Sequence, residues 1–492
     1  MSAAREPLRR ALIVGAGQVG VLAAVAIKRA SPATDVLVVG TPLDPVAFAD
    51  HIGTALPFTN RLHDRLGIDE EVLVRRAGAS HRLAIRYVGW AGAGSVGLTA
   101  YGGAVDPKLN SAFAREWGGG AHRAASGAPA GSVGAALAEA GRFMPPSGDA
   151  PSPLAEVDYA LRWNAPAYRD LLIGIAAQLG VRHHPGPVSA VQPMLDGGIA
   201  AIQLAGGDAV AADLFIDASG TAALLSATQP DRRWIDWRGA LPARSLAVGR
   251  PDAPRLDLAD RVAFTDAGWC WEQAGRDGVT RFLAVPGEVS DAAVETALGA
   301  PPADRFPIDA GRQDQPWTGN VVAIGDAAAR FEPLAGVALD LAHRQIDLLL
   351  DLFPGRAIDP RERAEYNRRF ALMADGTRDW IASHYAAPAA AHRLAALDRS
   401  PALDRMLDQF ARRQRLPITE EATVSTSEWA ALLHALGVPA RRSALSLAEG
   451  DDPGRRAAAA LDHKIAAALD AAPPYGAWIA HMLRDLSPNS SP

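Results

Sequence analysis

The chain has 492 residues, of which 49% are hydrophobic and 21% charged, as is typical of a globular protein with a sizeable core. Its 49 lysines and arginines against 55 aspartates and glutamates give a net charge of −6 without a long run of one sign, which argues against binding to nucleic acid or to an anionic membrane surface. The single cysteine, Cys270, excludes a disulfide within the chain and a cysteine-rich zinc site, and it favours a cytoplasmic location.

The first forty residues predict a strand, a helix and a second strand. Residues 11–14 have the short apolar run of a buried parallel strand, residues 18–30 the pattern of a helix, and residues 35–39 the run of the next strand. Arginines ahead of the apolar run resemble a signal peptide, but ordered glycines interrupt that run and no clean cleavage site follows. We therefore predict a βαβ unit, and no stretch elsewhere reaches the length of a membrane span.

The turn of this unit, "GAGQVG", predicts a dinucleotide-binding loop. Gly15 makes the turn, Gly17 lets the backbone approach a pyrophosphate, and Gly20 lets helix and strand pack closely. Gln18 and Val19 open the helix, whose N-terminus then faces the phosphates. The motif predicts that these five residues bind a cofactor.

One element of the dinucleotide motif is missing at the end of the second strand. An acid usually follows there and binds a ribose hydroxyl, but this chain has Gly40, and the nearest acid is Asp44. Binding of the adenosine half must therefore depend on the phosphate loop and on other contacts.

The middle of the chain alternates short predicted strands and helices. Alternating side chains predict a half-buried strand over residues 81–90, and an amphipathic pattern predicts a helix over 166–181. Residues 117–152 are rich in glycine, alanine and proline and predict loop with one short helix. Brief strands and glycine turns then lead to a buried strand that ends at Asp217. His183 and His184, predicted in a loop after the helix, lack partners at ligand spacing, and we predict no metal site.

A second strand–turn–helix pattern occurs at residues 320–353. An apolar strand delivers Gly325 and Asp326, and a long amphipathic helix begins near Gly336 and Val337. Asp326 is placed to accept a hydrogen bond from a polyol such as the ribityl chain of a flavin, and the helix N-terminus favours a bound anion. An aspartate that only caps a helix is the alternative, but together with the first loop the pattern favours FAD.

The remaining chain is mainly helical from about residue 359, with an alanine-rich helix pair at 455–485 and a polar tail at 487–492. The predicted fold class is α/β: a Rossmann-like FAD module of monooxygenase type with an elaborated, mostly helical substrate module. We predict two domains, residues 1–357 with inserted substrate-side strands and loops, and residues 358–492 packing on them.

These motifs give the chain a resemblance to the flavin-dependent tryptophan halogenases. The resemblance covers nearly the whole length, in the family's order and at plausible spacing. It is carried by "GAGQVG", "ASHRLAIRYVGW", "YALRWNAPAYRDLLIGIAAQLGV", "ADLFIDASG", "WIDWRGALPARSLAV", "GWCW", "NVVAIGDAAARFEPL" and "YNRRFALMADGTRDWIASHY".

The resemblance implies an enzyme that takes reduced FAD from a separate flavin reductase. Members of the family use it to oxidise halide, and the hypohalous acid travels to a lysine beside an aromatic substrate. The expected partners are therefore a small indole-like or other aromatic molecule, the diffusible reduced flavin and a halide ion. The sequence leaves a homodimer open.

Two departures from the family pattern bear on its chemistry. Arg82 stands where the resemblance implies the catalytic lysine, and Ala335 stands where it implies a glutamate. A guanidinium stays protonated and is a poor nucleophile, although it can hydrogen-bond to a hypohalous acid or hold a carboxylate. We predict Arg82 as the catalytic residue, with an ion pair as its structural alternative. The two changes together predict little ordinary halogenation.

Three functions stay open at this point. The first is a two-component halogenase with altered machinery. The second is a flavin monooxygenase or oxidase that does not halogenate. The third is a flavin-binding pseudoenzyme that acts as a partner protein. Other conspicuous side chains are expected to pack in the core rather than to act on a substrate: Trp90, Trp163, Trp234, Trp237, His343, His384 and Tyr385.

Overall fold

A computed structural model describes residues 6–102, 132–146, 151–194, 197–394, 397–414, 416–441 and 452–484. These residues form two compact units, each assembled from three stretches of the chain. Unit 1 comprises residues 1–78, 163–245 and 306–378, and unit 2 comprises residues 79–162, 246–305 and 379–492. None of the described helices is long and apolar enough to cross a lipid bilayer.

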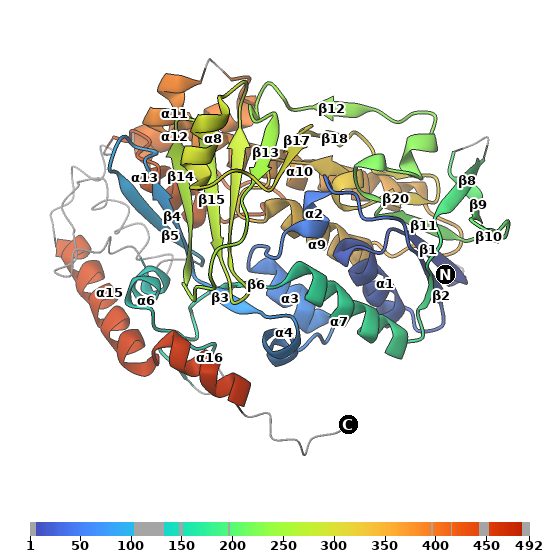
Figure 1. Cartoon of the computed structure of the whole chain (residues 1–492), viewed down its shortest axis with the longest axis horizontal. Coiled ribbons are helices and arrows are strands. Elements are labelled where there is room, and N and C mark those ends of the chain that lie inside the picture. The colour runs from blue at the N-terminus through green and yellow to red at the C-terminus, as the bar shows by residue number, and fades with distance from the viewer. Residues whose placement is uncertain are drawn as a thin grey trace. The chain divides into compact units, whose positions relative to one another are not determined.

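Unit 1 is built on a six-stranded sheet whose order is β19-β20-β11-β1-β2-β7 (Figure 1). The strands from β20 to β7 run parallel, and β19 is antiparallel to β20. The bounds are β1 (Arg10–Val14), β2 (Asp35–Val39), β7 (Arg182–His184), β11 (Leu214–Asp217), β19 (Trp317–Thr318) and β20 (Val321–Ala323).

Helices cover one face of this sheet, with α1 packed against both α7 and α9 (Figure 1). Helix α7 begins where the Asn164 side chain accepts the Ala167 N–H, and the proline at its start suits the first turn. The helices of unit 1 are α1 (Gln18–Ala30), α2 (Phe48–His51), α3 (Phe58–Arg65), α4 (Glu70–Arg76), α7 (Ala165–Gln178), α9 (Val337–Asp351) and the first part of α10 (Pro360–Ser383).

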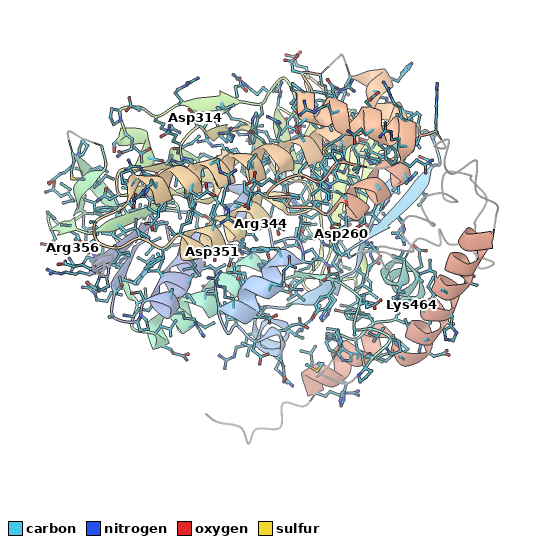
Figure 2. All side chains as sticks on the ribbon, turned by 180° about the vertical axis from the view of Figure 1, so that it is seen from behind. Asp260, Asp314, Arg344, Asp351, Arg356 and Lys464 are labelled. Carbon is cyan, nitrogen blue, oxygen red and sulfur yellow. The ribbon has the colours of Figure 1, made fainter. Side chains whose placement is uncertain are left out.

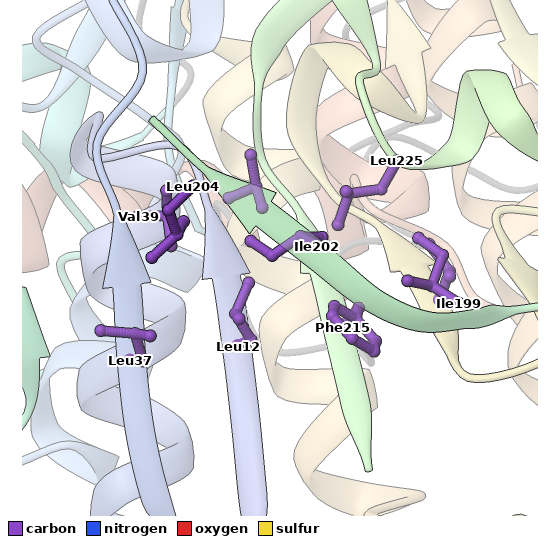
Figure 3. Packing of buried hydrophobic residues seen from close by; sticks show 10 residues of the cluster. Leu12, Leu37, Val39, Ile199, Ile202, Leu204, Phe215 and Leu225 are labelled. Carbon is purple, nitrogen blue, oxygen red and sulfur yellow. The ribbon is translucent and has the colours of Figure 1, made fainter. Parts of the chain in front are cut away.

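Apolar side chains on the other face of the sheet pack against a three-stranded sheet (Figure 3). Ile202 and Leu204 point to the same side of their strand, because they are alternate residues. In Figure 3 they lie above Leu12 and Phe215. This second sheet has the order β10-β9-β8, and a third has the order β12-β18-β21. The bounds are β8 (Val188–Pro193), β9 (Ile199–Leu204), β10 (Ala209–Ala211), β12 (Trp234–Asp236), β18 (Gly311–Gln313) and β21 (Ala329–Arg330).

Unit 2 is built on a seven-stranded sheet whose order is β17-β13-β16-β15-β14-β4-β5, beside a two-stranded sheet of β3 and β6. Its strands are β3 (Ser80–Arg82), β4 (Ala84–Val88), β5 (Val96–Ala100), β6 (Ala160–Arg162), β13 (Ser245–Val248), β14 (Ala259–Thr265), β15 (Gly268–Ala274), β16 (Val279–Val285) and β17 (Asp304–Pro307). Its helices are α6 (Val133–Ala140), α8 (Asp291–Leu298), α11 (Pro388–Arg393), α12 (Pro401–Arg413), α13 (Thr426–Ala435), α15 (Asp452–Ala471) and α16 (Tyr475–Arg484).

Most elements predicted from the sequence occur where they were expected. Strands β1, β2 and β11, helices α1, α7 and α9, and the pair α15 and α16 match the predicted ranges to within a few residues. Of the loop-rich stretch 117–152, residues 117–131 and 147–150 lie outside the described residues, as does the tail, and α6 is the short helix found in the rest.

The strand predicted over residues 81–90 is two strands in different sheets. β3 pairs with β6, whereas β4 pairs with β5 and β14. The chain passes from one to the other at Leu83, whose N–H bonds to the Leu258 carbonyl. Residues 80–85 are all buried, not half-buried as predicted, because both sides of this stretch face protein.

Two further predictions differ from the structure. His183 and His184 belong to β7, which pairs with the carboxyl end of β2, so they lie in an edge strand and not in a loop. The predicted boundary between residues 357 and 358 does not separate the two units, because α10 runs from unit 1 into unit 2 and residues 79–162 join unit 2. Pairing between distant strands decides this division, and a continuous sequence pattern does not reveal such pairing.

Candidate functional site

The glycine loop of unit 1 connects β1 to α1 at the carboxyl edge of the parallel sheet. In open sheets of this kind, ligands bind at that edge. Gly15 has a φ of +116°, and a Cβ there would lie 2.0 Å from the Ala218 carbonyl oxygen, so only glycine fits. The loop thus has the backbone geometry that the sequence predicts for a phosphate-binding turn.

The second motif meets the first loop within unit 1. Gly325 has a φ of +67°, and a Cβ added there would lie 3.3 Å from a methyl carbon of Val19. The Gly325 N–H donates to Gln345 Oε1 at 3.0 Å, and Gln345 returns a bond to the Ala323 carbonyl, which fixes the turn after β20. The structure therefore brings together two motifs that are separated by about 300 residues in the sequence.

Asp326 is buried, and its carboxylate bonds to the backbone of a neighbouring segment. Its Oδ2 accepts the Ala49 N–H at 2.9 Å. Burial raises the pKa of the Asp326 carboxyl to about 7, against the lowering effect of the Ala49 bond and with a further rise from the nearby Asp50 carboxyl. Asp326, which was predicted to accept a hydrogen bond from a flavin polyol, thus accepts one from Ala49 of α2.

Asp50, which follows Ala49 on α2, places its carboxylate on the glycine loop. Its Oδ1 accepts the Val19 N–H at 3.0 Å. A Cβ added at Gly17 would lie 2.2 Å from that same oxygen, so the carboxylate lies directly against the loop backbone. Burial raises the pKa of Asp50 to about 6, although the Val19 bond lowers it.

Gln18 was predicted to bind a cofactor, but its hydrogen bonds stay within the protein. Its Nε2 donates to the carbonyls of Ala49 and Ile52 at 2.7 and 2.9 Å, and its Oε1 accepts from the indole N–H of Trp163 at 3.1 Å. The side chain is fully buried. Gln18 therefore fixes the position of α2 against the start of α1.

The turn before α9 is closely packed. Gly336 has a φ of +80°, and a Cβ there would lie 2.2 Å from the Thr54 carbonyl oxygen. Ala335, fully buried, also has a left-handed backbone with a φ of +55°, which is uncommon for a residue other than glycine. Val337, the first residue of α9, is buried as well.

The donors and acceptors in unit 1 suit a dinucleotide in kind, and two of them are hydrogen-bonded to α2. Backbone N–H groups at the start of α1 and a buried acid at the end of β20 are the groups that a flavin nucleotide requires. Asp50 lies on the loop and Ala49 engages Asp326. A ligand that binds these groups would have to replace the hydrogen bonds that Asp50 and Ala49 make to them.

Unit 2 holds Arg82, the residue predicted to be catalytic, in a buried ion pair. Its Nη1 bonds to Asp260 Oδ2 at 2.7 Å, and neither side chain is exposed (Asp260 is labelled in Figure 2). Burial alone would lower the pKa of Arg82, but Tyr101 and Asp260 raise it above its ordinary value. The guanidinium therefore keeps its charge.

Asp260 also binds a second arginine and a tryptophan. Arg162 Nη1 bonds to its Oδ1 at 3.1 Å, and the Trp271 indole N–H donates to its Oδ2 at 3.1 Å. Arg162 further donates to the carbonyls of His81 and Ala274 at 2.6 and 2.5 Å. Two guanidiniums around one carboxylate give this group a net charge of +1 inside unit 2.

His343 and His384, which the sequence predicts to pack in the core, are buried and neutral. Burial lowers the pKa of His384 to about 4, and its Nδ1 lies 3.0 Å from the Trp380 carbonyl. His343 is fully buried with its Nδ1 2.7 Å from Thr59 Oγ1, and burial lowers its pKa well below the ordinary value. Within the described part of the chain, no three histidine, cysteine, aspartate or glutamate side chains group to hold a metal ion.

The sequence analysis missed the two acids that matter most in these sites. Asp50 lies only ten residues past Gly40, where an acid was looked for and not found. Asp260 is the acid of strand β14, next to Arg261, and an acid needs a partner when it is buried. The positions of both acids are visible in the sequence, but the sequence does not indicate which group each acid binds.

Comparison with known proteins identifies one family. The family model described as tryptophan halogenase matches residues 10–451. Tryptophan 7-halogenase RebH from Lentzea aerocolonigenes is 28% identical over 409 residues, which are 76% of this chain and 75% of the relative. Tryptophan 7-halogenase KtzQ from Kutzneria sp. is 26% identical over 77% of this chain and 76% of its own length.

Solved structures of similar proteins have the same fold. BrvH, a flavin-dependent halogenase from Brevundimonas sp. BAL3, superposes with a TM-score of 0.83 at 26% identity, over 96% of this chain and 99% of that one. Xcc4156, a flavin-dependent halogenase from Xanthomonas campestris, gives a TM-score of 0.86 at 22% identity, over 97% and 99%. The predicted α/β class with a Rossmann-like FAD module is confirmed.

Proposed function

Because the chain belongs to the tryptophan halogenase family, we propose that it is an FAD-dependent oxidoreductase that acts on an indole-like or other aromatic substrate. The observation that carries this proposal is the meeting of the two turns in unit 1, where Val19 of the glycine loop lies against Gly325. The names of the relatives, which act on tryptophan, support an aromatic substrate.

The residues proposed to hold FAD are those of the two turns. Bound reduced FAD would supply the electrons for oxygen activation, and the chain would hold it through the helix N-terminus, the buried acid and the turn before α9. We propose that a separate flavin reductase supplies the reduced form and that the protein acts in the cytoplasm. We also propose that it binds a halide ion and forms a homodimer. The proposed cofactor-binding residues are Gly15, Gly17, Gln18, Val19, Gly20, Gly325, Asp326, Gly336 and Val337.

Arg82 is the proposed catalytic residue of unit 2. Because its guanidinium stays charged, it would donate hydrogen bonds to an oxidant or to a substrate carboxylate and would not carry halogen as an amine does. Its buried bond to Asp260 favours orientation of such a group over direct attack. This catalytic role stays a prediction.

A second candidate function is favoured by the same ion pair. With Arg82 held by Asp260 and with Ala335 at the turn before α9, the chain lacks an obvious halogen carrier at those two positions. A flavin monooxygenase or oxidase that does not halogenate is therefore the alternative. A flavin-binding pseudoenzyme is the third, supported by Gly40 and by the acid on the glycine loop.

Gly17→Ala is expected to weaken FAD binding by at least about tenfold, because a methyl group on the loop would keep a pyrophosphate from approaching the backbone closely. The same methyl group would lie 2.2 Å from Asp50 Oδ1, so the variant cannot keep the Asp50 contact either. Titration of oxidised FAD followed by flavin fluorescence measures the dissociation constants. Gly174→Ala is the matched control, since a Cβ at that helical position meets nothing within 4 Å. Equal FAD affinity in Gly17→Ala and the wild type would mean that the loop does not bind the pyrophosphate.

The purified protein is expected not to oxidise NADPH without an added flavin reductase. The sequence contains one GxGxxG motif between a strand and a helix, Gly15 to Gly20, which is assigned to FAD. The other match, Gly92 to Gly97, connects the antiparallel strands β4 and β5, and it therefore gives little support for a nicotinamide site. Absorbance at the NADPH band, with FAD present and then with reductase added, tests this expectation. Rapid oxidation before the reductase is added would contradict supply from a second protein.

A further inference from the structure

The glycine loop of unit 1 already binds an anion that belongs to the protein. Backbone N–H groups at a helix N-terminus form an anion site, and phosphate is the ligand such loops usually take. Here the Asp50 carboxylate accepts the Val19 N–H at 3.0 Å and lies against Gly17. The carboxylate thus makes the contact that a phosphate oxygen would make.

The same segment engages the second cofactor-binding motif. The Ala49 N–H donates to Asp326 Oδ2 at 2.9 Å, which is where a sugar-chain hydroxyl would otherwise bond. One short helix, α2, therefore occupies both the phosphate position and the polyol position. Ala49 and Asp50 are adjacent residues of α2, so one short segment makes both contacts.

Further bonds hold this segment, residues 44–51, in place within unit 1. Asp44 accepts the Thr221 N–H at 2.8 Å and also bonds to the Thr221 hydroxyl. The Asp44 carbonyl oxygen lies 2.9 Å from His51 Nε2, which ties the two ends of the segment together. Gln18 donates to the Ala49 carbonyl from the loop itself. The segment is therefore anchored, and it does not merely lie over the loop.

The cost of this arrangement is that three acids lie close to one another, with Asp326 buried and Asp44 and Asp50 half-buried. Asp50 faces Val19, His51, Arg169 and Asp44, while Asp326 faces Ala49, Asp50, Arg330 and Asp44. Burial of a carboxylate without a full counter-charge is unfavourable. A segment that buries such acids is suited to leave when a stronger anion competes for the same donors.

We propose that residues 44–51 form an internal plug that competes with FAD for the glycine loop, with the Asp50 carboxylate in the place of a phosphate. The proposal rests on the proposed function, because it presumes that FAD is the competing ligand. FAD binds only after α2 leaves the loop, so the plug lowers the affinity of this chain for the cofactor.

Two variants of Asp50 separate the plug from a direct role of this residue in cofactor binding. Asp50→Ala removes the carboxylate and is expected to tighten FAD binding by about tenfold. Asp50→Asn keeps an oxygen that can accept the Val19 N–H but removes the buried charge, and FAD binding is expected to be equal to the wild type or weaker. Asp208→Ala removes an exposed acid of unit 1 and is the matched control, expected to bind FAD like the wild type.

A measurement on the flavin-free protein tests the hydrogen bond between the Val19 N–H and the Asp50 carboxylate directly. Hydrogen exchange of the peptide that contains Val19 is expected to be about tenfold faster in flavin-free Asp50→Ala than in the wild type, because the amide loses its acceptor. Asp50→Asn and Asp208→Ala are expected to keep the slow exchange. The thermal midpoint of each variant shows whether it is folded.

The outcomes distinguish failure of the plug from failure of the proposed function. Tighter FAD binding together with faster Val19 exchange in Asp50→Ala supports the plug. If the wild type binds FAD and Asp50→Ala binds it equally or more weakly, the plug is overturned and the proposed function stands. About 100 μM is far above the dissociation constant of a usable cofactor. If none of the proteins binds FAD at that concentration, both the proposed function and the proposed plug are contradicted.

Discussion

Asp260→Asn is expected to lower the free energy of unfolding of the protein by about 3–5 kcal/mol, the range measured when one partner of a buried ion pair is removed. Asp260 is the shared carboxylate of Arg82 and Arg162, and all three side chains are almost fully buried. Asparagine has nearly the same shape but no charge, so two guanidiniums would remain in a low-dielectric interior with no carboxylate between them.

Urea denaturation followed by tryptophan fluorescence measures this loss, since Trp271 donates to the same carboxylate. Asp398→Asn is the control, because Asp398 is an exposed acid of unit 2. A change of less than about 1 kcal/mol in Asp260→Asn, within the range of an exposed pair, would show that the two arginines are solvated and not buried as the structure has them.

The wild-type protein is expected to form at least about 100-fold less halotryptophan than RebH when both receive a flavin reductase, FAD, halide and tryptophan. The reason lies at two positions. Arg82 keeps its proton beside Asp260 and is a poor carrier of halogen, and Ala335 has no carboxylate to stabilise positive charge on an aromatic ring. Mass spectrometry of the products shows the isotope pattern of the halogen.

Arg82→Lys and the double change with Ala335→Glu complete this test. A lysine amine next to the Asp260 carboxylate would also stay protonated, so the single change is expected to restore little activity. Groups that act as a unit do not lose or regain activity additively, so the double variant is expected to form more halotryptophan than the wild type or Arg82→Lys. Halogenation by the wild type as fast as by the double variant would mean that both positions are misassigned, whereas an oxygenated aromatic product would favour the second candidate function.

The parts of the fold that follow from local sequence were predicted, and those that depend on distant pairing were not. The apolar run of β1, the glycines after it and the periodicity of α1 lie within about twenty residues, so their pattern is visible in the sequence. Residues 81–90 looked like one half-buried strand, yet β3 and β4 pair with partners in different sheets. No local pattern distinguishes those partners.

The same limit applies to the site. The sequence predicted that Gly325 and the glycine loop belong together, because a known combination of motifs requires it. The partner of Arg82 lies 178 residues away, and the acid on the loop lies 31 residues from Val19. An acid near a motif is common in any sequence, and only the path of the chain decides whether it reaches the motif.

Reoxidation of reduced FAD by air tests the central claim most directly. Reduced FAD is mixed anaerobically with an excess of the protein and then with oxygen, and the flavin absorbance is followed over time. If the chain is an FAD-dependent oxidoreductase, the wild type will give a time course that differs from that of free reduced FAD. Gly17→Ala will give a time course shifted toward that of the free flavin, because a methyl group on the loop hinders approach of the pyrophosphate. A wild-type time course identical to that of free reduced FAD would contradict the account.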